Sequence, residues 1–143
     1  MKKNILLIIS VLSIGSFLYS GTVQPSLSMR FNDVVNQQSE NGGAIDPVLV
    51  LGFAMSLEEG VYAGFDSDGE DSRIFVSFDY GTVGMGINAD GDAQFTIGAN
   101  YAALSNLNVS LDYVINNLAS ALDENDEETT VPNELRLSLG VTF

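Results

Sequence analysis

The chain has 143 residues, and its 19 acidic residues against 5 lysines and arginines give a formal net charge of -14. This length suits one ordinary domain. The sequence contains no histidine, cysteine or tryptophan. Without histidine, Ser-His-Asp hydrolysis and imidazole metal sites are excluded; without cysteine, disulfides, zinc knuckles, iron–sulfur clusters and a lipid-modified N-terminal cysteine are excluded. The excess of acid argues against nucleic-acid binding, because phosphates are held by lysine and arginine.

Hydrophobic residues make up 45% of the chain and charged residues only 17%. A sequence this apolar is not a disordered acidic tail, so it buries its apolar surface in a core or in lipid. We therefore expect a folded protein that is not an enzyme and that carries no cofactor.

The first twenty residues have the layout of a secretory signal peptide. Two lysines are followed by an apolar run over residues 5–18, and the small residues Ser20 and Gly21 offer a cleavage site. The alternative is an N-terminal membrane anchor, but this run is short for a span, which needs about 20 residues. No basic stop-transfer cluster follows it. We expect residues 1–20 to be cleaved and residues 21–143 to form the mature domain.

Strict alternation of apolar and polar residues runs through the mature domain. A period of two indicates a strand with one apolar and one polar face. The pattern is clearest at the C-terminus, where one face carries Leu135, Leu137, Leu139, Val141 and Phe143. It predicts eight strands, at residues 27–32, 48–57, 61–66, 73–80, 82–89, 93–101, 106–115 and 133–143. Residues 116–122 have room for one helical turn at most.

The links between these predicted strands differ in length. The two longest, at residues 33–46 and 117–132, are odd-numbered, whereas every even-numbered link is short. In an up-and-down meander, odd links lie at one end of the sheet and even links at the other. We therefore expect an all-β, eight-stranded, antiparallel up-and-down barrel, trimmed at one end and carrying longer loops at the other.

The composition of the polar face indicates which way that face points. It consists of small and polar side chains and carries all three arginines of the mature domain, with no lysine. Small residues suit the narrow interior of an eight-stranded barrel, whereas a solvated exterior usually carries lysine and glutamate. This composition favours a transmembrane barrel, whose apolar face contacts lipid, over a soluble secreted barrel or sandwich.

Aromatic residues on the apolar face lie near the predicted strand ends, at two levels typical of the interfacial girdles of a membrane barrel. Toward the long-loop end these are Phe31, Phe65 and Tyr113, and toward the short-turn end they are Tyr80, Tyr101 and Phe143.

The signal peptide, the eight alternating strands, the short even turns, the longer odd loops and the terminal Phe143 resemble the small bacterial outer-membrane barrels of the OmpA/OmpX type, in the porin-like superfamily. The resemblance is architectural, covers the mature domain and includes no subfamily motif. It implies a location in the outer membrane of a Gram-negative cell envelope, with outer-membrane lipid and the barrel-assembly machinery as partners. It also implies that Leu135, Leu137, Leu139, Val141 and Phe143 form the C-terminal signal that this machinery reads, and that the short turns face the periplasm.

The arginines of the polar face have acidic residues available as partners. We predict a lumen charge network that consists of Arg30, Arg73, Arg136, Asp79, Asp112 and Glu134. Such charges either line a narrow ion-conducting pore or form a salt-bridged plug that stiffens the barrel. We favour the plug, because eight strands rarely leave a continuous channel.

Acidic loops are the second candidate site. Residues 66–71 lack the D-x-D-x-D-G order and the trailing glutamate of a calcium loop, and residues 88–92 fit a hairpin turn. With residues 123–128, these loops have the composition to bind divalent cations weakly, but solvated, charge-rich loops are the plainer interpretation. We predict no specific metal site.

The sequence therefore predicts no catalytic residue. Outer-membrane enzymes resemble each other in needing a catalytic histidine, which this chain lacks. Two functions remain: a structural or surface-interaction role, with a surface ligand held by residues 33–46 and 117–132, or a minor porin-like channel for small solutes or ions. We expect a monomer.

Overall fold

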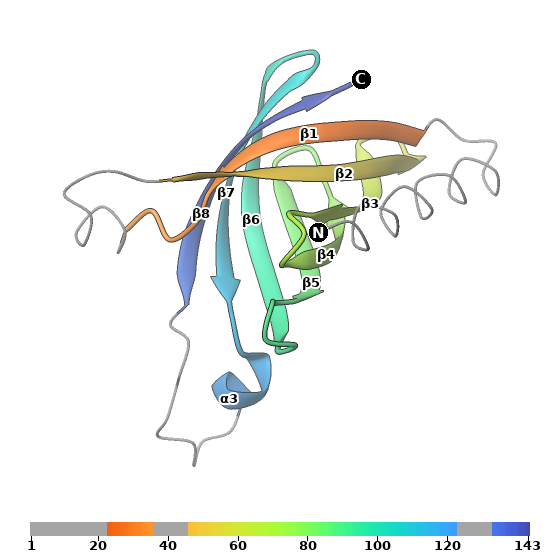
Figure 1. Cartoon of the computed structure of the whole chain (residues 1–143). Helices are drawn as coiled ribbons and strands as arrows, with labels where there is room; N and C mark the ends of the chain where they lie inside the picture. The colour runs from red at the N-terminus through yellow and green to blue at the C-terminus, as the bar shows by residue number, and fades with distance from the viewer. Residues whose placement is uncertain (1–22, 36–45, 123–132) are drawn as a thin grey trace.

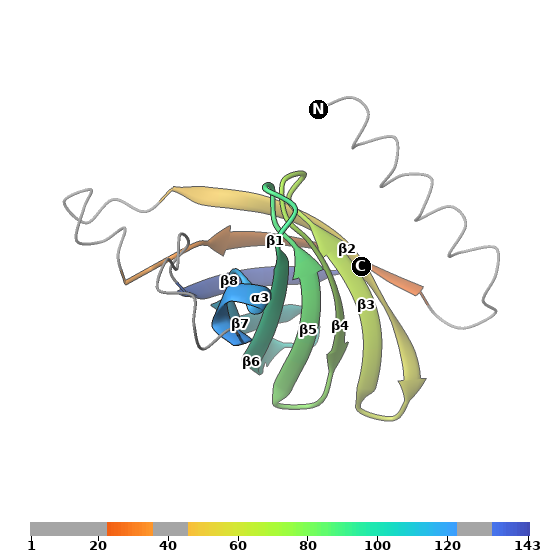
Figure 2. The same ribbon diagram turned by 90° about the horizontal axis from the view of Figure 1, so that it is seen from below.

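The computed structural model describes residues 23–35, 46–122 and 133–143, which form a closed barrel of eight strands with one short helix (Figure 1, Figure 2). The elements are β1 (Val23–Phe31), β2 (Pro47–Glu58), β3 (Val61–Ser67), β4 (Ser72–Ser77), β5 (Gly81–Ile87), β6 (Ala93–Leu104), β7 (Leu107–Ile115), α3 (Leu118–Leu122) and β8 (Glu134–Thr142). Each strand pairs antiparallel with its neighbour along the chain, and β1 pairs with β8 to close the barrel. The expected all-β, eight-stranded up-and-down barrel is confirmed. The expected signal peptide lies outside the described residues.

The strand boundaries differ from the sequence-based ones where turns interrupt the alternation. The fourth strand was expected to reach residue 80, but β4 ends at Ser77. Residues 78–80 instead form the β4–β5 turn, in which the Phe78 N–H donates to the Gly81 carbonyl at 2.7 Å. In contrast, β1 begins four residues earlier than expected, because Val23 and the residues after it pair with β2.

The alternation places the polar face inside the barrel and the apolar face outside. Among the described residues, Val50 and Val114 are the only large hydrophobic side chains that are buried, whereas Asp112 is 2% exposed and both Arg30 and Arg136 are buried. The large exposed side chains of the outer face include Met29, Leu49, Leu51, Ile74, Val83, Met85, Ile87, Ile97, Leu111 and Leu139. This is the reverse of the arrangement in a protein whose strands fold around an apolar core in water.

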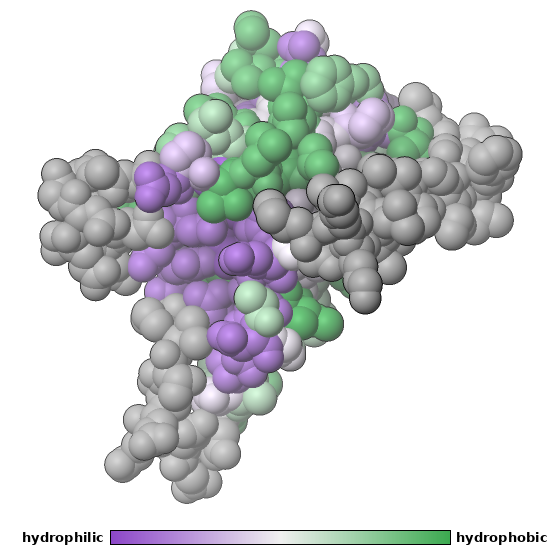
Figure 3. All heavy atoms as spheres, in the orientation of Figure 1, coloured by the Kyte–Doolittle hydropathy of each residue, from purple (hydrophilic) through white to green (hydrophobic). Residues whose placement is uncertain are grey.

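The two ends of the barrel differ. The short-turn end carries the β2–β3, β4–β5 and β6–β7 turns, and the long-loop end carries the β1–β2, β3–β4, β5–β6 and β7–β8 links. In the space-filling view, hydrophobic surface gathers over the upper part, toward the β6–β7 turn, and hydrophilic surface gathers over the middle and lower left (Figure 3). Polar groups therefore concentrate toward the long-loop end.

Candidate functional site: an inner charge network

Eight charged side chains meet inside the barrel, and we call them the inner charge network. They are Arg30, Asp66, Asp68, Asp71, Arg73, Asp112, Glu134 and Arg136, joined by five ion pairs. They come from β1, β3, β4, β7, β8 and the β3–β4 turn. Alternation explains why strand residues of the network meet, since inward positions of neighbouring strands share one narrow lumen.

Arg73 joins opposite sides of the lumen. Its Nη2 donates to Asp66 Oδ2 at 2.6 Å, on the adjacent strand β3. Its Nη1 donates to Asp112 Oδ2 at 3.0 Å, on β7, three strands away along the sheet. The guanidinium also lies over the ring of Phe75, 5.4 Å from the centroid. Arg73 therefore acts as a crosslink that fills the lumen at this level.

The β3–β4 turn folds over the opening of the barrel. Asp68 pairs with Arg30 on β1, and the Nη2 of Arg136 on β8 donates to Asp71 Oδ2 at 2.7 Å. The turn is held in shape because Asp68 Oδ1 accepts the backbone N–H groups of Glu70 at 2.9 Å and Asp71 at 2.7 Å. Gly69 has a φ of 96°, a conformation that favours glycine. The turn thus reaches the two strands that close the barrel.

Neutral polar groups extend the network toward the long-loop end. Gln94 Nε2 donates to Asn116 Oδ1 at 2.7 Å and to Asp71 Oδ2 at 3.3 Å. Asn88 Nδ2 donates to the Asn116 carbonyl at 3.3 Å. Gln94 therefore ties the β3–β4 turn to β6 and, through Asn116, to the start of the β7–β8 link.

Asp112 has an unusual environment within the network. It is almost fully buried, and its Oδ1 has no hydrogen-bond partner. A Cβ built on Gly98, its register partner on β6, would lie 1.9 Å from that Oδ1. Glycine at position 98 therefore provides the space in which Asp112 can turn toward Arg73.

Five of the six residues predicted for the lumen network lie in it: Arg30, Arg73, Arg136, Asp112 and Glu134. Asp79 does not. It was expected on the polar face of a strand that continued to residue 80, but β4 stops at Ser77 and Asp79 lies exposed in the β4–β5 turn. There its carboxylate lies beside Gly60 of the neighbouring β2–β3 turn.

The sequence-based prediction missed Asp66, Asp68 and Asp71. Asp66 was detectable, because it alternates with Ala63 and Phe65 and so belongs to the inward face of β3. The two turn residues carried no such signal, because alternation says nothing about the direction in which a turn folds. Their partners are 38 and 65 residues away along the chain.

The other predicted residues lie on the outer surface or near strand ends. Leu135, Leu137, Leu139 and Val141 alternate with the inward residues of β8, and the Phe143 N–H donates to the Pro25 carbonyl at 3.0 Å. Of the aromatic residues, Phe31, Phe65 and Tyr113 lie in the long-loop halves of β1, β3 and β7. Tyr101 lies in the short-turn half of β6, and Tyr80 lies in the β4–β5 turn with 83% of its surface exposed.

The acidic loop at residues 88–92 forms a tight turn. In residues 88–92, Asn88 Oδ1 accepts the N–H groups of Asp90 at 3.0 Å and Asp92 at 2.8 Å, as expected for a tight hairpin. Within the described ranges, no group of three or more Asp, Glu, His or Cys side chains is arranged to hold a metal ion. Residues 123–128 lie outside these ranges.

The inner charge network combines three arginines with five carboxylates, and its ion pairs link β1 and β8 to the β3–β4 turn and β4 to β7. In the part of the chain that the structure describes, no helix is long and apolar enough to cross a membrane.

Comparisons of the chain with protein-family models, with curated proteins and with solved structures found no match.

Proposed function

We propose that this protein is a monomeric, non-enzymatic integral barrel of a bacterial outer membrane, with a structural or surface-interaction role carried by its long-loop end. The observation that carries the proposal is the inverted barrel, with ion pairs inside and large apolar side chains on the outside of most strands. The resemblance to OmpA/OmpX-type barrels supports the same assignment, with the barrel-assembly machinery as the partner that reads the C-terminal residues.

The energetics of the outer face favour lipid as its surroundings. Ile74 is 65% exposed, and Leu49, Met85 and Ile97 are each more than half exposed on other strands. Apolar surface left in water costs about 25 cal/mol per Å², so large exposed apolar side chains on seven of the eight strands are strongly unfavourable in solution. A closed barrel also has no unpaired sheet edge, which lipid requires because it offers no hydrogen bonds to the backbone.

The inner charge network supports a structural role over conduction. Its ion pairs cross the lumen from β4 to β7, and the β3–β4 turn lies over the opening with Asp68 and Asp71 paired to β1 and β8. An eight-stranded barrel leaves an interior just wide enough for side chains. We therefore propose that the lumen is closed, and that surface interaction involves residues 33–46 and 117–132.

Heat-modifiable gel mobility tests the membrane assignment. The mature chain is refolded in detergent and run unboiled and boiled, beside its circular dichroism spectrum. We expect faster migration of the unboiled sample and a β-type spectrum, because a closed barrel resists detergent. Identical mobility of the two samples, with protein that stays soluble after detergent removal, would contradict the proposal.

The channel is the alternative function, and planar-bilayer recording separates it from the structural role. We expect the reconstituted protein to give no stable unit currents. Stable currents whose size changes in Arg73→Ala would replace the structural role by that of a small channel for solutes or ions. Gel mobility of the same variant shows whether it still folds.

A further inference from the structure

The strands on one side of the barrel are much shorter than those on the other. β3, β4 and β5 contain seven, six and seven residues, and we call their outer surface the short face. β2 and β6, which flank it, contain twelve residues each. With about 3.3 Å per residue and a tilt of about 45°, β4 rises about 14 Å along the barrel axis and β6 about 28 Å. The hydrocarbon core of a bilayer is about 30 Å thick.

The missing height lies at opposite ends on the two sides of the short face. On the β2 side, the register pairs Ser67, the last residue of β3, with Leu51, so β2 continues four residues beyond β3 toward the long-loop end. The register pairs Gly81, the first residue of β5, with Ala99, so β6 continues five residues beyond β5 toward the short-turn end. The adjoining β4–β5 turn exposes Phe78 and Tyr80 rather than charged residues alone. Thus the strands of the short face end before β2 at one end of the barrel and before β6 at the other.

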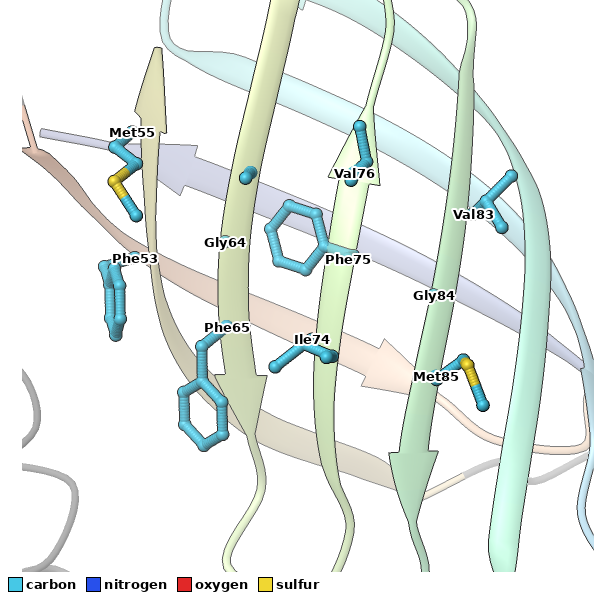
Figure 4. A pocket seen from close by; sticks show the side chains of 11 residues that line it. Phe53, Met55, Gly64, Phe65, Ile74, Phe75, Val76, Val83, Gly84 and Met85 are labelled. Atoms are coloured by element: carbon cyan, nitrogen blue, oxygen red, sulfur yellow. The ribbon is translucent and has the colours of Figure 1, made fainter. Parts of the chain in front are cut away.

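The short face also carries a groove of about 470 Å³ on its apolar outer surface. One wall is a row of register neighbours across four strands, namely Phe53, Phe65, Ile74 and Met85 (Figure 4). In the next row Ala63 stands between larger side chains, which leaves the groove open above β3. A second groove of about 310 Å³ shares Phe65, Ile74 and Met85 and continues toward Ile87, at the long-loop end.

The chemistry of the first groove selects its occupant. Its lining contains no charged or hydrogen-bonding side chain, so it offers nothing to a polar headgroup. The backbone groups beneath it are paired in the ladders of β2–β5, so a peptide cannot add as a further strand. A hydrocarbon chain needs neither kind of partner.

We propose that the short face binds the acyl chains of membrane phospholipids and thins the bilayer beside it, with one chain held in the groove. The inference rests on the proposed membrane location. A bilayer next to a short apolar surface must thin, and short-chain lipids lower the cost of thinning. The groove would hold an acyl chain that bends into the space beyond the ends of the shorter strands.

The absence of tryptophan from the chain allows a direct test. Ile97→Trp places a reporter on β6 beside Val83 at the edge of the groove, and Leu139→Trp places a matched one on β8. Each variant is reconstituted in vesicles of phosphatidylcholine with 22-carbon chains that contain a small fraction of phosphatidylcholine with brominated 14-carbon chains. Bromine quenches tryptophan on contact. From the degree of quenching, we expect the fraction of short-chain lipid in contact with the tryptophan to be about threefold higher for Ile97→Trp than for Leu139→Trp.

A groove-filling substitution provides the second arm. Ala63→Leu should reduce the excess quenching of Ile97→Trp, whereas Ala99→Leu, the same change on the outer face of β6 and outside the groove, should leave it unchanged. Equal quenching of both reporters would overturn the inference and leave the membrane location standing. Weaker quenching at Ile97→Trp that falls further as protein is added would show a second copy on this face. Absence of quenching at both positions would instead contradict the proposed function itself.

Discussion

At the scale of single residues, the position of a charged side chain inside the barrel depends on where a glycine leaves space as well as on where its charged partner lies. Asp112 is buried beside Gly98, and its Oδ1 has no hydrogen-bond partner. Its other oxygen accepts a hydrogen bond from Arg73 at 3.0 Å. The glycine therefore fixes the position of a carboxylate that links β7 to β4.

We predict that Gly98→Ala destabilises the barrel by about 1–3 kcal/mol. The added methyl would lie 1.9 Å from Asp112 Oδ1, so the carboxylate has to move away from Arg73. Gly81→Ala on the adjacent strand is the matched control, because a Cβ there would lie 3.5 Å from its nearest neighbour. Urea midpoints from circular dichroism measure the difference. Equal urea midpoints for the two variants would contradict this prediction, because they would mean that the Asp112 carboxylate tolerates a methyl group at position 98.

At the scale of elements, the β3–β4 turn links the two strands that meet at the barrel seam. Asp68 pairs with Arg30 on β1, and Asp71 pairs with Arg136 on β8, the two strands that close the barrel. Both ion pairs are largely shielded from solvent. The turn therefore contributes to closure although it is far from the seam along the chain.

We predict that Asp68→Asn lowers the free energy of unfolding by about 3 kcal/mol, because it leaves the buried Arg30 without its carboxylate. Glu70→Gln is the matched control, since Glu70 is exposed in the same turn and lies outside the inner charge network. The temperature at which the fast-migrating gel band disappears provides the measurement. A similar temperature for both variants would contradict the stabilising role of the ion pair between Asp68 and Arg30.

The two faces of β8 lead to opposite expectations for adjacent residues. Leu139 lies on the outer face and Ser138 on the inner face. In a membrane, Leu139→Arg should cost about 2–4 kcal/mol and block assembly, because it places a charge in the hydrocarbon region. Ser138→Ala should change the folding yield only slightly. Folding yield in detergent and in vesicles measures both, and equal tolerance would contradict the assigned orientation.

At the scale of the whole molecule, closure makes the strands interdependent. Each strand pairs with two others, and β1 pairs with β8 more than a hundred residues along the chain. No strand can leave without exposing two rows of backbone groups, so we predict a single cooperative unfolding transition. Urea curves from gel mobility and from circular dichroism should coincide. Separate midpoints would show that part of the barrel opens first.

Alternation in the sequence is enough to predict the fold class, because alternation is a local property. A period of two in Leu135 to Phe143 assigns each side chain to a face, and eight such segments with short even turns leave few alternatives to a meander. The same parity assigned Arg30, Arg73, Arg136, Asp112 and Glu134 to the inward face. It would also have assigned Asp66.

The pairing of the charges, the end of β4 and the length of the strands on each side of the barrel depend on tertiary contacts. Asp68 and Asp71 meet their arginines because the β3–β4 turn brings them to β1 and β8, and Asp79 lies outside the network because its strand ends at Ser77. These features depend on contacts between residues distant along the chain. No local pattern encodes them, because the partner that fixes each one is brought close only when β1 and β8 join.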